Sequence, residues 1–124
     1  MHQTITNFKN IQNLIKENQE KTKNKNKIKI IAVSKTFEIE HINPLIEDGH
    51  CDFGENKVQE ALEKWSNIKT KNKKLSLHLV GKLQSNKTKL ALKIFDYIHS
   101  LDSEKLANKI SEEQKKINKK PKLF

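Results

Sequence analysis

Short apolar runs rich in β-branched residues alternate with stretches of helical periodicity along most of this chain. The clearest run, residues 28–35 (IKIIAVSK), is typical of a buried parallel strand. Shorter strand candidates are at 51–53, 75–81 and 97–100, and helical patterns follow at 39–46, 58–65, 87–94 and 103–118. A strand followed by a helix, four times over, predicts an α/β fold with a parallel sheet, and units this regular favour a (β/α) barrel.

The two ends of the chain extend this pattern. Residues 121–124 (PKLF) indicate the opening of a fifth strand, and one apolar stripe at helical spacing predicts a helix ahead of the first strand: Ile5, Phe8, Ile11, Leu14 and Ile15. A complete barrel needs eight strands and about 200 residues or more. We therefore expect residues 1–124 to be the N-terminal part, about the first half, of a single barrel domain. Open sheet edges and apolar faces would then favour self-association.

Two local features leave alternatives or set limits. Pro44 either kinks one helix or begins a second helix capped by Asn43, and Gly49 is a plausible C-terminal stop. Cys51, the single cysteine, cannot form an internal disulfide, and its spacing from the five histidines is not that of metal ligands. No apolar stretch is long enough for a membrane span and the N-terminus does not resemble a signal peptide, so we expect a cytoplasmic protein with neither metal nor membrane partner.

The net charge of +10 raises the question of nucleic-acid binding. All 25 basic residues are lysine, and arginine, whose planar fork reads phosphates and guanines, is absent. The excess lies in residues 61–124, in clusters at 69–74 and 115–120 where loops or a solvated helix end are expected. We interpret these clusters as a solvated fringe, and a lysine-rich nucleic-acid-binding fragment stays an alternative.

Three segments at predicted strand ends carry candidate chemistry, because those ends form the functional face of a barrel. Lys35 follows a buried strand, where desolvation can make an amine a nucleophile toward an aldehyde. Asn56, after the turn at Gly54, can direct its amide toward Lys35, and His78 lies on a strand that ends at Gly81. From spacing alone, the simpler interpretations are a solvated lysine, a helix-capping asparagine and a hydrogen-bonded structural histidine.

Together these segments resemble one known family. AVSKT at 32–36, FGEN-x-VQE at 53–60, H-x-x-G-x-LQSNK at 78–87 and HSLD at 99–102 occur in the order and spacing of the pyridoxal phosphate homeostasis (YggS/PROSC-like) proteins. The resemblance implies an alanine-racemase-like barrel that carries pyridoxal 5′-phosphate as a Schiff base on Lys35. It also implies that Asn56, His78 and Ser100 lie near the cofactor, whose phosphate-binding loops follow later strands and are expected beyond Phe124.

The same resemblance implies a carrier or regulator of the vitamin B6 pool without established turnover. The alternative is a pyridoxal-phosphate-dependent enzyme such as an amino-acid racemase. A racemase needs a second acid/base residue on the opposite face of the cofactor, and no residue of this chain is a convincing candidate for it. We therefore assign no catalytic residue.

Overall fold

The computed structural model describes residues 3–35 and 37–124, which form two compact units. The first unit contains residues 3–30 and 37–50, and the second contains residues 31–35 and 51–124. Within this described part of the chain, no helix has both the length and the apolar content to cross a bilayer.

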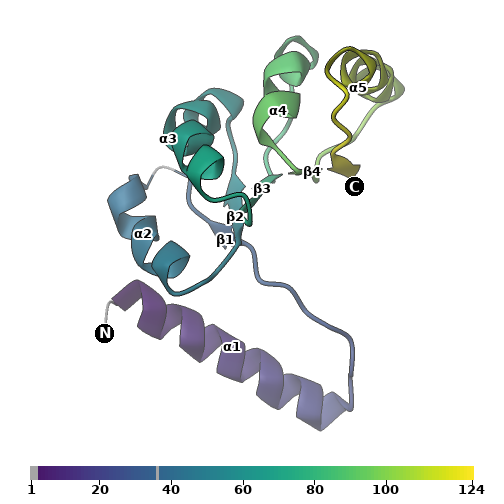
Figure 1. The fold of residues 1–124 in the computed structure, drawn as a ribbon. Helices are drawn as coiled ribbons and strands as arrows, with labels where there is room; N and C mark the ends of the chain where they lie inside the picture. The colour runs from purple at the N-terminus through teal and green to yellow at the C-terminus, as the bar shows by residue number, and fades with distance from the viewer. Residues whose placement is uncertain (1–2, 36) are drawn as a thin grey trace. The chain divides into compact units, whose positions relative to one another are not determined.

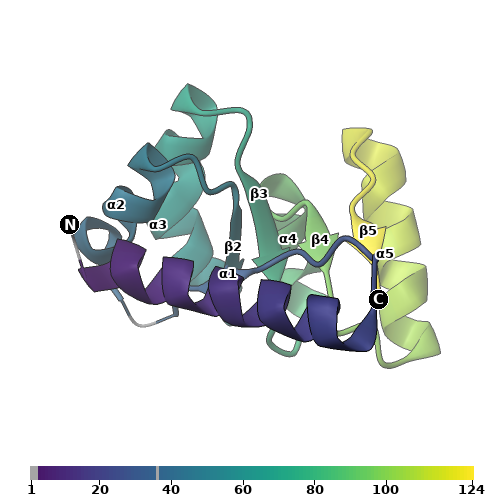
Figure 2. The ribbon, with the colours of Figure 1, turned by 90° about the horizontal axis from the view of Figure 1, so that it is seen from below.

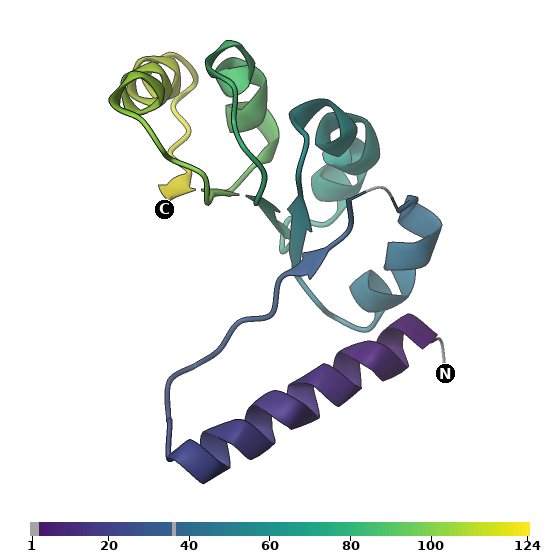
Figure 3. The same cartoon turned by 180° about the vertical axis from the view of Figure 1, so that it is seen from behind.

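The first unit is a pair of helices, α1 (Gln3–Thr22) and α2 (Ile39–Glu47). Helix α2 lies beside the N-terminal part of α1 (Figure 3), where the Phe8 ring is 4.6 Å from the ring of His50. The helix predicted ahead of the first strand is confirmed. Its apolar stripe is not buried, since Ile11 and Leu14 are 47% and 58% exposed.

Helix α2 resolves the alternative at Pro44, which lies inside one continuous helix. Gly49 follows the C-cap residue Asp48 and stops the helix as predicted, since its φ of 96° lies in the left-handed region that glycine adopts without strain. The Gly49 amide donates to the Ile46 carbonyl at 3.1 Å, and the His50 amide donates to the Leu45 carbonyl at 3.0 Å. These two bonds satisfy the last carbonyl groups of the helix in a Schellman motif.

The second unit contains a parallel sheet of five strands in chain order. The strands are β1 (Ala32–Val33), β2 (Asp52–Glu55), β3 (Ser76–Leu79), β4 (Tyr97–Ile98) and β5 (Lys122–Leu123). Figure 2 shows β2 to β5 one after another. Parallel strands in sequential order are the arrangement of consecutive units of a (β/α) barrel, so the predicted fold class is confirmed. Strand β1 is much shorter than the predicted run 28–35, since only Ala32 and Val33 of that run pair with β2.

Three helices lie in a row on one side of this sheet (Figure 1): α3 (Val58–Lys71), α4 (Thr88–Ile94) and α5 (Glu104–Ile117). A short 3₁₀ turn, η1 (Ser85–Lys87), leads into α4. Helix α3 continues past its predicted end at Trp65 through lysines expected in a loop, since Lys69 and Lys71 occupy its last turn, where cations are favourable.

The two faces of the sheet differ in what they contact. The helix face carries Phe53, Leu77 and Ile98, all almost fully buried, and the Phe53 ring is 5.0 Å from that of Trp65 on α3. The alternate residues of the same strands, among them Gly54 and His78, lie on the opposite face, which we call the far face.

Candidate functional site

The sheet register brings the ends of the strands to one level. Val33, Gly54, His78, Tyr97 and Lys122 are aligned across the five strands. The residues two positions further along are Lys35, Asn56, Val80, His99 and Phe124. The backbone bonds that continue the ladder past β3 and β4 are 3.0 Å from the Val80 amide to the Glu55 carbonyl and 2.9 Å from the His99 amide to the Leu79 carbonyl. We call the five residues Lys35, Asn56, Val80, His99 and Phe124 the strand-end row.

Lys35 lies one residue beyond Ser34, which follows the edge strand β1, and the side chain of Lys35 is exposed. Burial by the described residues therefore does not desolvate its amine, contrary to our expectation from the buried appearance of the 28–35 run. The residue before it is held firmly, since the Ser34 amide donates to the Gly54 carbonyl at 2.9 Å. The amine is thus free to meet a ligand while its backbone is anchored to β2.

Beneath Lys35, a buried polar cluster joins β1, β2 and α3. Its centre is the Glu55 carboxylate, which is fully buried on the helix face. Glu55 Oε2 accepts hydrogen bonds from Ser34 Oγ and from Trp65 Nε1, the latter at 2.9 Å. Lys64 Nζ donates to the same oxygen at 3.0 Å and to the Ser34 carbonyl at 2.7 Å. Every polar group of this buried carboxylate has a partner, as burial requires.

Asn56 is half-buried and lies one strand away from Lys35 in the strand-end row. A close approach of the loop after β3 fixes its backbone. A Cβ atom on Gly81 would lie 2.5 Å from the Asn56 carbonyl oxygen and 2.9 Å from the Asn56 Cα. Only glycine fits there, so the Gly81 identified from the sequence has a packing role against the predicted site residue. Asn56 is not the N-cap of α3, because that position is Lys57.

His78 is 1% exposed on the far face, and both of its ring nitrogens have protein partners. Nε2 lies 2.9 Å from Asp52 Oδ1, and Nδ1 lies 2.9 Å from His99 Nε2. The Tyr97 ring stacks on it with centroids 4.2 Å apart and an interplanar angle of 7°. His78 is thereby held rigidly within the sheet.

These contacts determine the proton positions in the chain of two imidazoles. The Asp52 carboxylate can only accept, so a neutral His78 carries its proton on Nε2 and accepts at Nδ1. If His99 is also neutral, it then donates from its Nε2, and its Nδ1 is the unprotonated nitrogen. The His99 ring also stacks on Phe124, with centroids 5.0 Å apart. Of the two histidines, His99 is the one in the strand-end row. Tyr97 and His99 alternate along the predicted strand 97–100, and this pattern could have identified His99 as a site residue from the sequence.

Ser100, the fourth predicted residue, follows His99. Its Oγ is buried and has no hydrogen-bond partner within residues 3–35 and 37–124. A buried hydroxyl without a partner is uncommon in folded proteins and is suited to a ligand or a further protein group.

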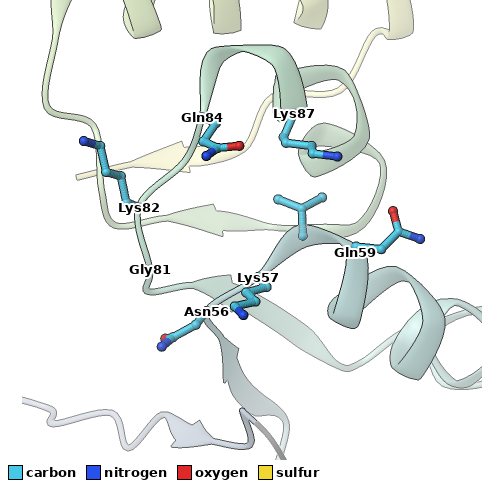
Figure 4. A pocket seen from close by; sticks show the side chains of 8 residues that line it. Asn56, Lys57, Gln59, Gly81, Lys82, Gln84 and Lys87 are labelled. Carbon is cyan, nitrogen blue, oxygen red and sulfur yellow. The ribbon is translucent and has the colours of Figure 1, made fainter.

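A cavity of about 490 Å³ opens beside the ends of β2 and β3. Asn56 and Gly81 line it, together with three lysines: Lys57, Lys82 and Lys87. Figure 4 shows these lysine side chains extending in different directions instead of toward one point. The cavity is therefore positively charged, but its ammonium groups do not converge as they would around a single phosphate.

A second cavity, of about 350 Å³, lies at the opposite, N-terminal end of the strands. Its lining includes Asp96, Tyr97 and Lys119. Burial lowers the pKa of Lys119, the charge of Lys69 lowers it further, and Asp96 opposes the shift. Lys119 lies at the end of the strands away from Lys35. In the described part of the chain, no group of three or more His, Cys, Asp or Glu residues is arranged to hold a metal ion.

Comparison with known proteins gives a consistent set of relatives. No family model matches the chain. It is 41% identical over 103 residues to the pyridoxal phosphate homeostasis protein of Haemophilus influenzae, covering 83% of this chain and 43% of that protein. It is 45% identical over 94 residues to the protein of the same name from Pasteurella multocida, covering 76% of this chain and 40% of that one. The chain thus spans about two fifths of the length of these curated relatives.

Solved structures agree with the sequence relatives. PipY of Synechococcus elongatus without pyridoxal phosphate matches with a TM-score of 0.73 and 42% identity, over 77% of this chain and 44% of PipY. PipY with pyridoxal phosphate bound matches with the same TM-score and 38% identity, over 86% of this chain and 51% of that structure.

Proposed function

Since this chain belongs to the pyridoxal phosphate homeostasis family, we propose that it binds pyridoxal 5′-phosphate and takes part in the homeostasis of that cofactor. The observation that carries the proposal is the strand-end row. An exposed lysine, an amide and an imidazole lie there after β1, β2 and β4, with the unpartnered hydroxyl of Ser100 next to the imidazole in the sequence. This donor set fits an aldehyde cofactor with ring polar groups, and a structure of PipY contains pyridoxal phosphate.

Within this proposal, Lys35 holds the cofactor covalently as a Schiff base. Its Nζ would form a C=N double bond with the aldehyde carbon, and the carbonyl oxygen would leave as water with the two protons of the amine. Asn56 and Ser100 provide polar contacts to the bound molecule. His78 acts through His99, because the ring nitrogens of His78 already have partners in Asp52 and His99.

We further propose that the protein carries or regulates the cofactor without catalytic turnover. The relatives are named homeostasis proteins. The two imidazoles are joined to each other and to Asp52, which orients them but does not by itself supply an acid/base pair on opposite faces of a ligand. Racemisation or transamination above the rate of free pyridoxal phosphate, abolished by Lys35→Ala, would instead support the enzyme alternative.

The test is covalent trapping with pyridoxal phosphate and borohydride, followed by peptide mass spectrometry. We expect the reduced adduct predominantly on Lys35, at least tenfold above Lys57 and Lys82 at the same end of the sheet. Lys119 is the most stringent comparison, because it is a half-buried lysine with a lowered pKa that lies at the opposite end of the strands. Labelling spread evenly over these lysines would refute the assignment of Lys35.

Lys35→Ala is the matched variant for this experiment. It should remove the main adduct and leave the weaker labelling of Lys57 and Lys82 unchanged. Because Lys35 is exposed, its truncation should leave the unfolding midpoint close to that of the parent chain. Loss of all labelling together with loss of folding would indicate that the residue has a structural role instead.

A further inference from the structure

We infer that the buried Glu55–Lys64 ion pair positions Lys35 by holding the peptide unit that joins Ser34 to Lys35. This inference rests on the proposed role of Lys35 in binding pyridoxal phosphate. It assigns a supporting function to two side chains, Glu55 and Lys64. Their side-chain hydrogen bonds go to each other, to Ser34 and to residues of α3, and none of these residues belongs to the strand-end row. Glu55 and Lys64 are therefore positioning residues.

The first step is the weakness of β1 as a support. This strand is two residues long and pairs with β2 alone, so it has few ladder bonds with which to orient the residue that follows it. The Ser34 amide donates to the Gly54 carbonyl at 2.9 Å. The Ser34 carbonyl belongs to the same peptide unit as the Lys35 amide, and its acceptor is satisfied by a side chain: Lys64 Nζ, at 2.7 Å.

The second step is that Lys64 is itself held in place. Its side chain is 9% exposed, and its ammonium group also contacts Glu55 Oε2 at 3.0 Å and Glu60 Oε1 at 3.3 Å. Glu55 in turn binds Ser34 Oγ and Trp65 Nε1. Ser34 is thus held at its carbonyl by Lys64 and at its hydroxyl by Glu55, and these two partners are bonded to each other.

The third step is that the same carboxylate belongs to the residue before Asn56. Glu55 faces the helices and Asn56 follows it in the strand-end row, while Ser34 bears the same relation to Lys35. The cluster therefore links the backbone just before Lys35 to the backbone just before Asn56. Charge-assisted hydrogen bonds are about twice as strong as neutral ones, which suits them to fixing this spacing.

The test uses the full 124-residue chain and pyridoxal phosphate as the probe. The key variant is Glu55→Gln combined with Lys64→Met, which removes both charges together so that neither remains buried without its partner. The glutamine can still accept from Ser34 and Trp65, but the bond to the Ser34 carbonyl is gone. We expect the initial rate of Lys35 adduct formation, relative to Lys57 in the same molecule, to fall about tenfold.

The matched control is Lys69→Met on the same helix. Lys69 Nζ makes the same kind of contacts, since it donates to the Ile94 carbonyl at 2.9 Å and pairs with Asp96 Oδ2 at 2.5 Å. These contacts lie at the opposite, N-terminal end of the strands. Lys69→Met should lower the unfolding midpoint without changing the Lys35 to Lys57 ratio. A parental ratio in the double variant, or an equal fall in Lys69→Met, would overturn the inference in favour of a purely structural ion pair.

Two further measurements keep the inference testable. If the double variant does not fold, Ser34→Ala is the substitute, because it removes the hydroxyl bond to Glu55 and leaves the ion pair intact. The ratio of Lys35 to Lys57 adduct formation should then fall about threefold. Hydrogen exchange at the Lys35 amide needs no cofactor and should be faster in the double variant than in Lys69→Met. If the parent chain shows no preference for Lys35, the proposed function fails. The difference in hydrogen exchange still decides whether Lys64 holds the peptide between Ser34 and Lys35. Equal exchange in the two variants would refute that role of Lys64.

Discussion

Individual residues decide whether the loops after β2 and β3 can approach each other. Gly81 and Gly54 are both glycines of the second unit, but a side chain would meet different neighbours at each. At Gly81 the neighbours are backbone atoms of Asn56. At Gly54 they are the methyl groups of Ile31, Val33 and Val80, the nearest at 3.1 Å. Side-chain ends can shift, whereas the backbone of the strand-end row cannot do so cheaply.

Gly81→Ala is therefore expected to destabilise the protein by about 1–3 kcal/mol, the usual cost of overpacking. It should also move Asn56, because the new Cβ would lie 2.5 Å from the Asn56 carbonyl oxygen. Urea unfolding gives the first quantity, and the change in the Asn56 amide resonance gives the second. Gly54→Ala is the control and should have the smaller effect on both. An undisturbed Asn56 in Gly81→Ala would mean that the two loops are not in close contact.

Secondary-structure elements differ in how their ends are secured. Helix α5 begins at a clear cap, where Ser103 Oγ accepts a hydrogen bond from the Leu106 amide at 3.1 Å. Helices α3 and α4 have lysine at the N-cap and no side-chain cap bond. Their stability comes from burial, with Trp65 and Leu92 fully enclosed. Helix α5 also buries Leu106 and Ile110, so its cap and its packing support the same segment.

Ser103→Ala should lower the free energy of unfolding by about 0.5–2 kcal/mol, because the first turn of α5 loses the acceptor for one of its free amides. Ser103 is exposed, so the change leaves no cavity. The control is Ser66→Ala in the middle of α3, also at an exposed position, which should change stability by no more than about 0.5 kcal/mol. Comparable effects of the two substitutions in urea titrations would contradict a capping role for Ser103.

The molecule as described presents two sheet edges, β1 and β5, each with a single strand neighbour. Apolar side chains are exposed at or next to both edges, with Val33 47% and Phe124 64% accessible. An exposed strand edge with apolar neighbours is a template for pairing with another chain. The net charge of +10 opposes close approach, but the excess of positive charge lies in residues 61–124, whereas β1 belongs to the part of the chain in which lysines and acidic residues balance.

This chain is therefore predicted to self-associate, with a size-exclusion elution volume that falls as its concentration rises. Val33→Lys together with Leu123→Lys should restore elution near the monomer mass of 14.5 kDa, because charges on edge strands disfavour pairing. Leu14→Lys, which removes a more exposed apolar side chain from α1, should leave the association unchanged. If the parent chain elutes as a monomer at every concentration, the open edges do not drive association.

The sequence by itself determined the fold class, the order of the elements and the strand-end locations of Lys35 and Asn56, because alternating periodicity and turn residues are local signals. Only the tertiary structure decided which side chains meet. The exposure of Lys35 follows from β1 being an edge strand, and the pairing of His78 with Asp52 and His99 requires the register of three strands. The enclosure of Glu55 by Lys64 and Trp65 likewise depends on how α3 packs on β2, and contacts between residues far apart along the chain have no local signature.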